Sequence, residues 1–542
     1  MMNYFWRAFT VCCWLIVSIG GVGQVPNLPH TAGALPFAGQ VENLPHKGVD
    51  WRTATPESQG VASAELAAAI TQAREKNLAI HSLLIVRNGY LIAEAYFAPY
   101  DGKRPHDIAS VTKPLTGTLI GLALAQGKLK SVQAPLVSFF PKRQFKHDDE
   151  RKRRITLEHL LTMSSGLDCA GRGEPALWNM FLAADNTQFM LDLPMVSEPG
   201  AQYGYCSGGM HLLSSVVSKA TGMNAEAFAR KYLFAPLGIR NLIWPHDPQG
   251  VSHGFGNLHL LPRDMAKLGW LFLNQGKWQG KQIVPADWVA NATRSHIKTG
   301  GAGTSDYGYG WRVPTNNGPV AFEAGGRGGQ SISVLPSQNA VIVMNGGGFA
   351  NGDLMKQVLA AFKSDAALPA NPAGAAQLQA AIRMVSAPKT LPLKPDPPIA
   401  QKVSGQTYQL DANWMGLQTL SITFGAQTTA QMKFGFAFKQ SQWGTSSKVF
   451  GKARGATTYS ETRPVGRQGF AIFSPNGTLG APVGMRGHWE DDGQTFVLEY
   501  DEVSSTNCSW LRVTFSDGGV SVQAKERTGL FDEKFAGRLV GK

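Results

Sequence analysis

A serine and a lysine one helical turn apart are the residues of this chain best suited to chemistry. Ser110 is followed by Lys113, and apolar residues then recur at helical intervals up to a stop at Gln126 and Gly127. An i, i+3 pair lies on one helix face, so the amine of Lys113 can reach the hydroxyl of Ser110. The start of a helix also offers unpaired N–H groups and partial positive charge to a developing oxyanion. Because serine needs a neighbouring base to become a strong nucleophile, the pair indicates a serine acyl-transfer enzyme.

Two further Ser-x-x-Lys spacings lack this setting. Ser295 and Lys298 precede a glycine-rich segment and open no apolar helix. Ser386 and Lys389 flank Pro388, which interrupts helix continuity. Only the first pair therefore predicts a catalytic site.

A second candidate element is the turn-rich stretch 199–209, which precedes an apolar helix expected from Met210 to Ala220. A tyrosine on such a loop, Tyr203 or Tyr205, can point its hydroxyl into a cleft. Because a free phenol has a pKa near 10, it acts as a base only beside a cation, which Lys113 would supply. The alternative is that both tyrosines are ordinary packing residues.

A third candidate element is the glycine-rich stretch 323–330, which leads into a strand expected at Ile332. Glycine allows a substrate or an oxyanion to approach the backbone closely. A backbone N–H here, opposite that of Ser110, would complete an oxyanion hole. A plain glycine-rich hairpin is the alternative.

The bulk composition indicates a globular protein with more than one domain. The chain has 542 residues, 43% of them hydrophobic, and a formal net charge of +13. The basic run 151–154 is followed at once by an apolar segment, so we expect a solvated loop and no nucleic-acid partner. Residues 1–23 have the basic start, short apolar run and small residues of a signal peptide, which predicts a periplasmic or secreted protein without a stable membrane span after cleavage. An uncleaved anchor is the alternative.

The remaining chain divides into three predicted parts. Residues 45–365 contain two hairpin-like strand pairs, 81–97 around Asn88-Gly89 and 332–344, which bracket helical segments including 65–76. Residues 366–402 are rich in Ala and Pro and read as a linker, with a short helix at 373–385. Residues 403–542 alternate in short runs such as 417–424, 496–500 and 510–515, which predicts an all-β barrel or sandwich.

Three cysteines lie beyond the signal segment: Cys169, Cys206 and Cys508. A bridge between Cys169 and Cys206 is conceivable, but spacing does not establish it. No Cys or His pair has zinc-ligand spacing, so no metal site is expected.

Taken together, the three candidate elements resemble the class C β-lactamase and penicillin-recognising serine hydrolase family. That family has Ser-x-x-Lys, then Tyr-x-Asn, then a Lys-Thr-Gly-type strand, which correspond here to 110–113, 205–207 and 324–330. Supporting matches lie at 160–167, 233–239 and 307–311, so the resemblance covers about residues 45–365. It implies an α/β (α+β) fold, an antiparallel sheet flanked by helices with a helical subdomain, followed here by a C-terminal all-β domain. The C-terminal domain more weakly resembles lipocalin-like domains appended to such hydrolases.

The sequence departs from the family pattern at two positions. Ser207 replaces the usual Asn, and Glu323 stands roughly where the family has a lysine that grips a substrate carboxylate. Arg327 would be the residue to compensate. A literal Lys298-Thr299-Gly300 precedes the segment 307–311, the reverse of the family order, and is treated as a decoy. These variants look more like the esterase and nylon-oligomer hydrolase branch.

The resemblance implies an acyl-enzyme mechanism without metal or organic cofactor. Ser110 would be the nucleophile, with Lys113 and Tyr205 sharing proton transfer. Substrate and oxyanion contacts are expected from Ser207, Gly326, Arg327 and Gln330. The expected partner is a small ester, amide or peptide substrate. The alternatives are a cell-wall D-amino-acid peptidase or β-lactamase on the same scaffold, and a non-catalytic ligand-binding or sensor protein.

Overall fold

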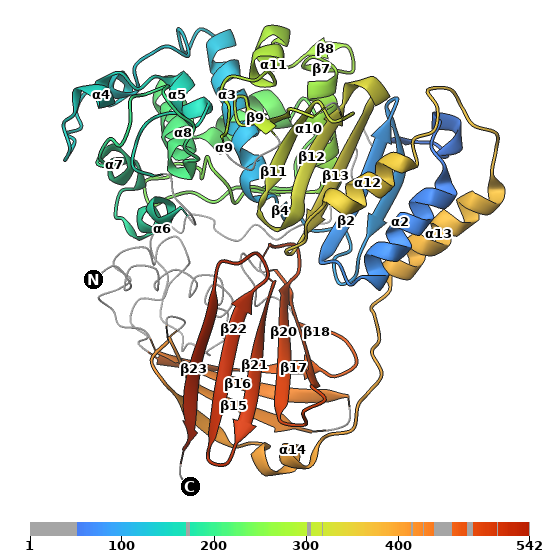
Figure 1. Cartoon of the computed structure of the whole chain (residues 1–542). Coiled ribbons are helices and arrows are strands. Elements are labelled where there is room, and N and C mark those ends of the chain that lie inside the picture. Colours follow the sequence, from blue (N-terminus) through green and yellow to red (C-terminus); the bar gives the residue numbers. More distant parts are fainter. Residues whose placement is uncertain are drawn as a thin grey trace, which may run out of the picture.

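The computed structural model describes residues 51–169, 174–300, 305–316, 318–413, 416–425, 428–437, 458–473, 481–506 and 508–540. The predicted signal peptide, 1–23, lies outside these residues. Two bodies are visible, a mixed α/β domain and, below it in Figure 1, a β-domain formed by the C-terminal part of the chain. In the part of the chain that is described, no helix has the length and hydropathy to cross a membrane.

The α/β domain is built on an eight-stranded sheet of order β1-β3-β2-β13-β12-β11-β10-β9. All its pairs are antiparallel except the short edge pair β1–β3, which is parallel and departs from the all-antiparallel expectation. The strands are β1 Arg52–Thr53, β2 Ile80–Arg87, β3 Tyr90–Tyr96, β9 Ser305–Tyr307, β10 Arg312–Pro314, β11 Phe322–Gly326, β12 Gln330–Leu335 and β13 Ala340–Gly346.

Both predicted hairpins are confirmed within this sheet. Asn88 and Gly89 have φ values of 50° and 79°, the left-handed pair that a two-residue turn between β2 and β3 requires. The early strands β2 and β3 and the late strands β12 and β13 are neighbours, as expected from their positions at the two ends of the domain.

Helices cover both faces of the sheet (Figure 1). One face packs on α2 Ser63–Glu75, α12 Gly352–Ala360 and α13 Pro372–Ser386. The helix α13 lies within the predicted linker, yet its Leu378, Ala381 and Val385 are buried in this same cluster. The opposite face belongs to a larger apolar cluster. The helices that contribute to this cluster are α3 Thr112–Ala125, α5 Leu157–Leu161, α6 Pro175–Leu182, α7 Asn186–Leu191, α8 Ser207–Thr221, α9 Ala225–Ala229, α10 Pro262–Leu273 and α11 Ala286–Ala292.

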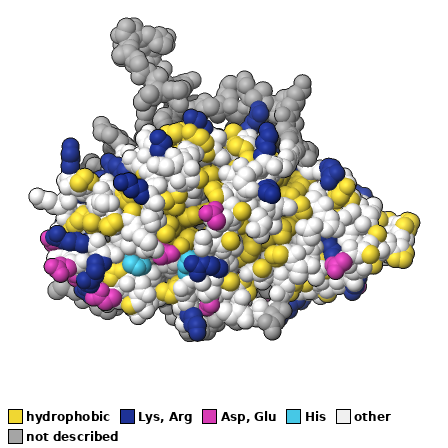
Figure 2. Space-filling model, turned by 90° about the horizontal axis from the view of Figure 1, so that it is seen from above, with side chains coloured by type: hydrophobic (Ala, Val, Ile, Leu, Met, Phe, Trp, Pro, Cys, Tyr) yellow, Lys and Arg dark blue, Asp and Glu magenta, His cyan; other side chains and the backbone are white. Residues whose placement is uncertain are grey.

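The basic run 151–154 is not the plain solvated loop expected. It forms most of a short helix, α4 Glu150–Arg153, because Asp149 caps its first turn. Lys152 is buried and donates to the carbonyl of Leu191, while Arg153 and Arg154 pair with nearby carboxylates. On the face shown in Figure 2, lysine and arginine side chains are dispersed around apolar surface and do not merge into one patch.

The C-terminal domain is a ten-stranded antiparallel sheet that closes on itself. Its order is β17-β16-β15-β14-β23-β22-β21-β20-β19-β18, and a parallel bridge between Gly466 of β17 and Arg486 of β19 closes the barrel. Apolar side chains fill its interior, and α14 Pro398–Val403 packs against them. The strands are β14 Thr407–Leu410, β15 Leu417–Phe424, β16 Thr429–Ala437, β17 Thr458–Gly466, β18 Ala471–Phe473, β19 Val483–Trp489, β20 Thr495–Glu502, β21 Cys508–Ser516, β22 Gly519–Glu526 and β23 Asp532–Leu539.

Candidate functional site

Ser110 lies in a tight 3₁₀ turn, Ala109–Val111, immediately before α3, and not within the α-helix itself. Ala109 has a φ of 46°, a left-handed conformation that a residue with a Cβ adopts at a cost. The carboxylate of Asp107 accepts the Ala109 N–H at 2.8 Å and thereby holds this turn. The Ser110 side chain remains partly exposed, as a nucleophile must be.

Lys113 occupies the first turn of α3 with its amine directed back at Ser110. Its Nζ donates to Ser110 Oγ at 2.8 Å and to the carbonyl oxygen of Phe255 at 2.9 Å. The side chain is only 1% exposed, so it is held in one orientation. Both bonds aim the amine at the serine hydroxyl, the arrangement that local proton transfer requires.

Tyr205 reaches the same place from a distant part of the chain. The Lys113 Nζ lies 4.7 Å from the centre of the Tyr205 ring, a cation–π distance. The loop that carries Tyr205 is tied down on both sides, since Gly204 N–H donates to the Met163 carbonyl and Cys206 N–H to Met163 Sδ. Ser110, Lys113 and Tyr205, which were predicted as a set, are therefore brought together.

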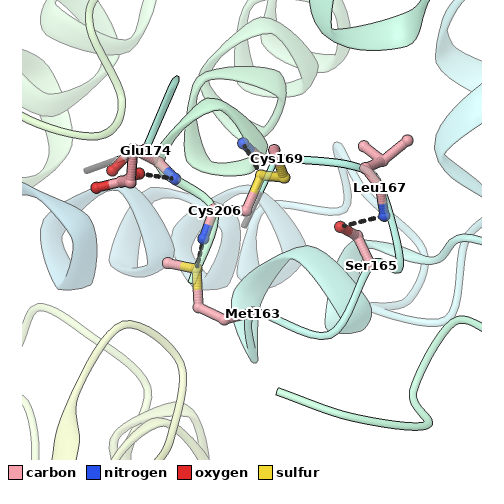
Figure 3. The surroundings of a disulfide bond; sticks show 8 residues. Met163, Ser165, Leu167, Cys169, Glu174 and Cys206 are labelled. Atoms are coloured by element: carbon pink, nitrogen blue, oxygen red, sulfur yellow. Dashed lines mark hydrogen bonds between the residues drawn. A yellow bond between two sulfur atoms is a disulfide. The ribbon is translucent and has the colours of Figure 1, made fainter. Parts of the chain in front are cut away.

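A disulfide anchors the residue that follows Tyr205 (Figure 3). Cys206 is bonded to Cys169, so the pairing left open from the sequence is formed. Cys206 also caps α8, because its Sγ accepts the Gly209 N–H at 3.2 Å. Beside it, the Glu174 carboxylate accepts the Ser207 N–H at 2.9 Å. The bond thus restricts the start of α8 and the tyrosine loop together.

The end of strand β11 abuts the Ser110 turn. A Cβ placed on Gly326 would lie 3.1 Å from the Ser110 nitrogen and 2.7 Å from the Ile108 carbonyl oxygen, so only glycine fits without displacing backbone. The backbone nitrogen of Ser110 and the end of β11 are therefore close neighbours. This is where the sequence predicts an oxyanion hole.

Two of the other predicted contact residues, Arg327 and Gln330, have side chains bonded elsewhere. Arg327 donates to Thr506, Glu526 and Thr528 of the barrel. Gln330 is buried, donates to the Gly346 carbonyl and accepts from Asn345 Nδ2 at 2.9 Å. The described hydrogen bonds of these two side chains thus support the barrel contact and the sheet. Ser207 is buried as the first residue of α8.

Arg312 is a charged neighbour of the site that the sequence reasoning missed. It lies on β10, opposite Glu323 of β11, and a Cβ on Gly325 would lie 2.8 Å from its Nη1. Glu323 accepts from the Ser333 hydroxyl at 2.8 Å, and burial raises the pKa of its carboxyl. Arg312, not Arg327, therefore supplies the cation beside β11. The available signal for Arg312 in the sequence was its position in the strand-like segment just after the 307–311 match.

The literal Lys298-Thr299-Gly300 lies away from this strand. Thr299 donates to the Ser305 carbonyl, at the start of edge strand β9. One strand, β10, separates β11 from that edge strand. The decoy interpretation agrees with this position.

The chain is similar to several known proteins. The family described as Beta-lactamase matches residues 66–360. The 6-aminohexanoate-dimer hydrolase of Paenarthrobacter ureafaciens is 25% identical over 38% of this chain and 55% of its own length. Esterase EstB of Burkholderia gladioli is 27% identical over 33% of this chain and 50% of its own. The chain thus spans about half the length of these curated relatives.

Among solved structures, a penicillin-binding protein homologue from Pyrococcus abyssi aligns with 88% of this chain and 99% of its own, at 16% identity and a TM-score of 0.46.

Proposed function

Because the chain belongs to the beta-lactamase family, we propose that it is a serine hydrolase that cleaves small esters or amides through an acyl-enzyme. The observation that carries the proposal is the contact of Lys113 with both partners, Ser110 Oγ at 2.8 Å and the Tyr205 ring at 4.7 Å. A hydroxyl and a phenol gathered around one amine are the parts that nucleophilic acyl transfer needs.

In acylation, Ser110 Oγ forms a bond to the substrate carbonyl carbon and its proton passes to the amine of Lys113. The N–H groups at Ser110 and at the end of β11 stabilise the oxyanion of the tetrahedral intermediate. Tyr205 relays a proton to the departing alcohol or amine as its bond to the carbonyl carbon breaks. Water then attacks the acyl-Ser110 ester, and the same groups act in reverse to release the acid.

Small esters and amides are favoured as substrates because a lysine at the position of Glu323 is missing. The buried Glu323 carboxyl cannot attract the carboxylate of a β-lactam or a peptide C-terminus. The names of the relatives, a 6-aminohexanoate-dimer hydrolase and an esterase, support the same class of substrates.

A cell-wall peptidase or β-lactamase is the second candidate, and Arg312 is the observation in its favour. Its guanidinium beside Gly325 offers a cation to a substrate carboxylate.

Export, the expected location, is supported by the Cys169–Cys206 disulfide, since such bonds persist in oxidising compartments.

Labelling with a fluorophosphonate probe tests the nucleophile. Ser110→Ala is expected to abolish labelling, whereas Ser295→Ala, the matched control from the decoy pair, should label like the unaltered protein. Labelling that persists in Ser110→Ala would overturn the assignment.

Turnover of p-nitrophenyl esters, nitrocefin and D-Ala peptides then separates the two candidates. Preference for the esters, with Arg312→Ala leaving their turnover unchanged, supports the first. Turnover of the carboxylate-bearing compounds with a KM raised by Arg312→Ala supports the second. A non-catalytic binding protein would show no acyl-enzyme burst with any activated ester.

A further inference from the structure

Three donor side chains of different chemistry meet where the barrel touches the catalytic domain. His81 lies on β2 of the catalytic sheet, while Asp501 on β20 and Cys508 on β21 face each other in the barrel register. One ligand atom from each lies within 4.8 Å of the others. Cys508 Sγ is 3.3 Å from Asp501 Oδ1, and His81 Nε2 is 3.9 Å from Asp501 Oδ2.

These spacings are close to those that one small cation imposes. Zinc binds imidazole nitrogen and carboxylate oxygen at about 2.0–2.2 Å and thiolate sulfur at about 2.3 Å, so tetrahedral ligand atoms lie roughly 3.3–3.8 Å apart. Because the three ligand atoms lie within 4.8 Å of one another, adjustments of about 1 Å, by rough comparison with that spacing, would bring all three donors onto one ion. A mixed sulfur, nitrogen and oxygen set suits zinc or cobalt and not magnesium or calcium.

The imidazole of His81 is oriented as a metal ligand by a second histidine. His81 Nδ1 lies 2.8 Å from His106 Nε2, and His106 Nδ1 lies 2.7 Å from the carbonyl oxygen of Asp107. Because a carbonyl only accepts, Nδ1 of His106 must carry a proton, and the complete burial of the ring disfavours a second proton on it. Its Nε2 therefore accepts from Nδ1 of His81. That leaves Nε2 of His81 unprotonated and facing the other two donors. Metal-bound histidines are oriented in the same way, by donating the other ring N–H to a neighbouring acceptor.

The three groups are also enclosed. His81 and Cys508 are 4% and 3% exposed, and a Cβ on Gly347 would collide with Cys508 Sγ. Burial raises the pKa of both the Asp501 carboxyl and the Cys508 thiol. Arg527, Arg486, Glu499 and Glu526 are the other charged groups that act on these two side chains. Glu499 accepts from Arg527 at 3.0 Å and from Arg486 at 2.8 Å.

We infer that His81 Nε2, the Asp501 carboxylate and Cys508 Sγ bind one divalent transition-metal ion of the zinc type across the domain boundary. Binding displaces the thiol proton to solvent and forms metal–sulfur, metal–nitrogen and metal–oxygen bonds without any redox change. The site is independent of the acyl-transfer chemistry proposed above.

The position of this site connects the barrel to the nucleophile turn. His106 and Asp107 form β4, and Asp107 holds the Ala109 N–H next to Ser110. On the barrel side, the Asp107 N–H donates to the Ser504 carbonyl, and Thr506 donates to the Asp107 carboxylate. A bound ion would fasten both sides of this contact at once.

Cobalt titration of the full-length protein tests the inference. Chelator-treated protein is expected to bind one equivalent of Co²⁺ with a thiolate-to-cobalt charge-transfer band, which Zn²⁺ then removes. Cys508→Ala should lose the band entirely. His106→Gln should weaken binding by about 10- to 100-fold, because it removes the ring that orients the ligand His81. His246→Ala, a matched control whose ring pairs with Glu226 elsewhere, should bind as the unaltered protein does.

Circular dichroism shows whether each variant folds. If Cys508→Ala does not fold, Asp501→Asn, a near-isosteric change, provides a second variant that alters a ligand. Zinc should also protect Cys508 from a thiol reagent in partly denaturing urea. The inference is overturned if folded protein binds no stoichiometric cobalt, or if cobalt binds without the charge-transfer band.

Discussion

Removing the bond between Cys169 and Cys206 has a calculable effect on stability. The double variant Cys169→Ser/Cys206→Ser frees a loop closed across a sequence separation of 37 residues. Chain-entropy arithmetic for a loop of that size gives about 4 kcal/mol of lost unfolding free energy at 25 °C. Urea unfolding of the oxidised protein and of the variant, followed by loss of esterase activity and by fluorescence, measures this difference.

The same variant should affect turnover more than substrate binding. Tyr205 precedes Cys206 directly, and its ring contacts the Lys113 amine. Because a displacement of about 1 Å at a catalytic group can cost about 100-fold in rate, we expect kcat with p-nitrophenyl esters to fall by about 10- to 100-fold.

Reductant provides the control for this prediction. Dithiothreitol should reproduce both effects in the unaltered protein and leave the double variant unchanged, since both proteins retain Cys508. An oxidised protein and a variant with equal unfolding free energies and equal kcat values would refute the claim that the disulfide holds the tyrosine loop.

Three further outcomes are expected. Ala109→Gly should change the unfolding free energy by between zero and about 1 kcal/mol in the stabilising direction, because relief of the left-handed φ of 46° exceeds the added chain entropy; a clear loss in urea unfolding would contradict this. Gly326→Ala should lower kcat/KM by about 100-fold or more with circular dichroism unchanged, because its Cβ would lie against the Ser110 nitrogen; near-normal kinetics would contradict it. Burial raises the pKa of Glu323, so the unaltered protein should lose stability as pH rises from the ordinary glutamate value through that raised pKa. Glu323→Gln should remove this loss, measured by urea unfolding at about pH 4 and about pH 8; identical pH slopes would contradict it.

Local patterns predicted the parts of the site that lie close together in the chain. Ser110 and Lys113 share one helical turn, and Asn88-Gly89 specifies its hairpin whatever surrounds it. Tyr205 needed the family resemblance, because nothing in its own loop distinguishes it from Tyr203. The assignment of the segment that forms β11 as the third element of the site also depended on the order of the family's motifs.

Some side-chain positions that the sequence did not reveal depend on contacts between distant segments. Arg327 follows β11 in sequence, but its side chain turns toward Glu526 of the barrel, whereas Arg312 reaches β11 from the neighbouring strand. His81 and Cys508 come from different domains, and no spacing rule anticipates their approach. Side-chain direction at a domain boundary is set by packing, which a single sequence does not display.

The docking of α13 on α2 has a consequence for where this protein can be cut. Leu378 and Val385 complete an apolar layer over the sheet, and Arg74 donates to the Ala387 carbonyl at 2.8 Å. A fragment that stops at residue 365 would leave this layer facing water and would be prone to aggregate. The smallest catalytic fragment worth expressing therefore extends through Ala387, and it would still lack the barrel residues that touch Asp107.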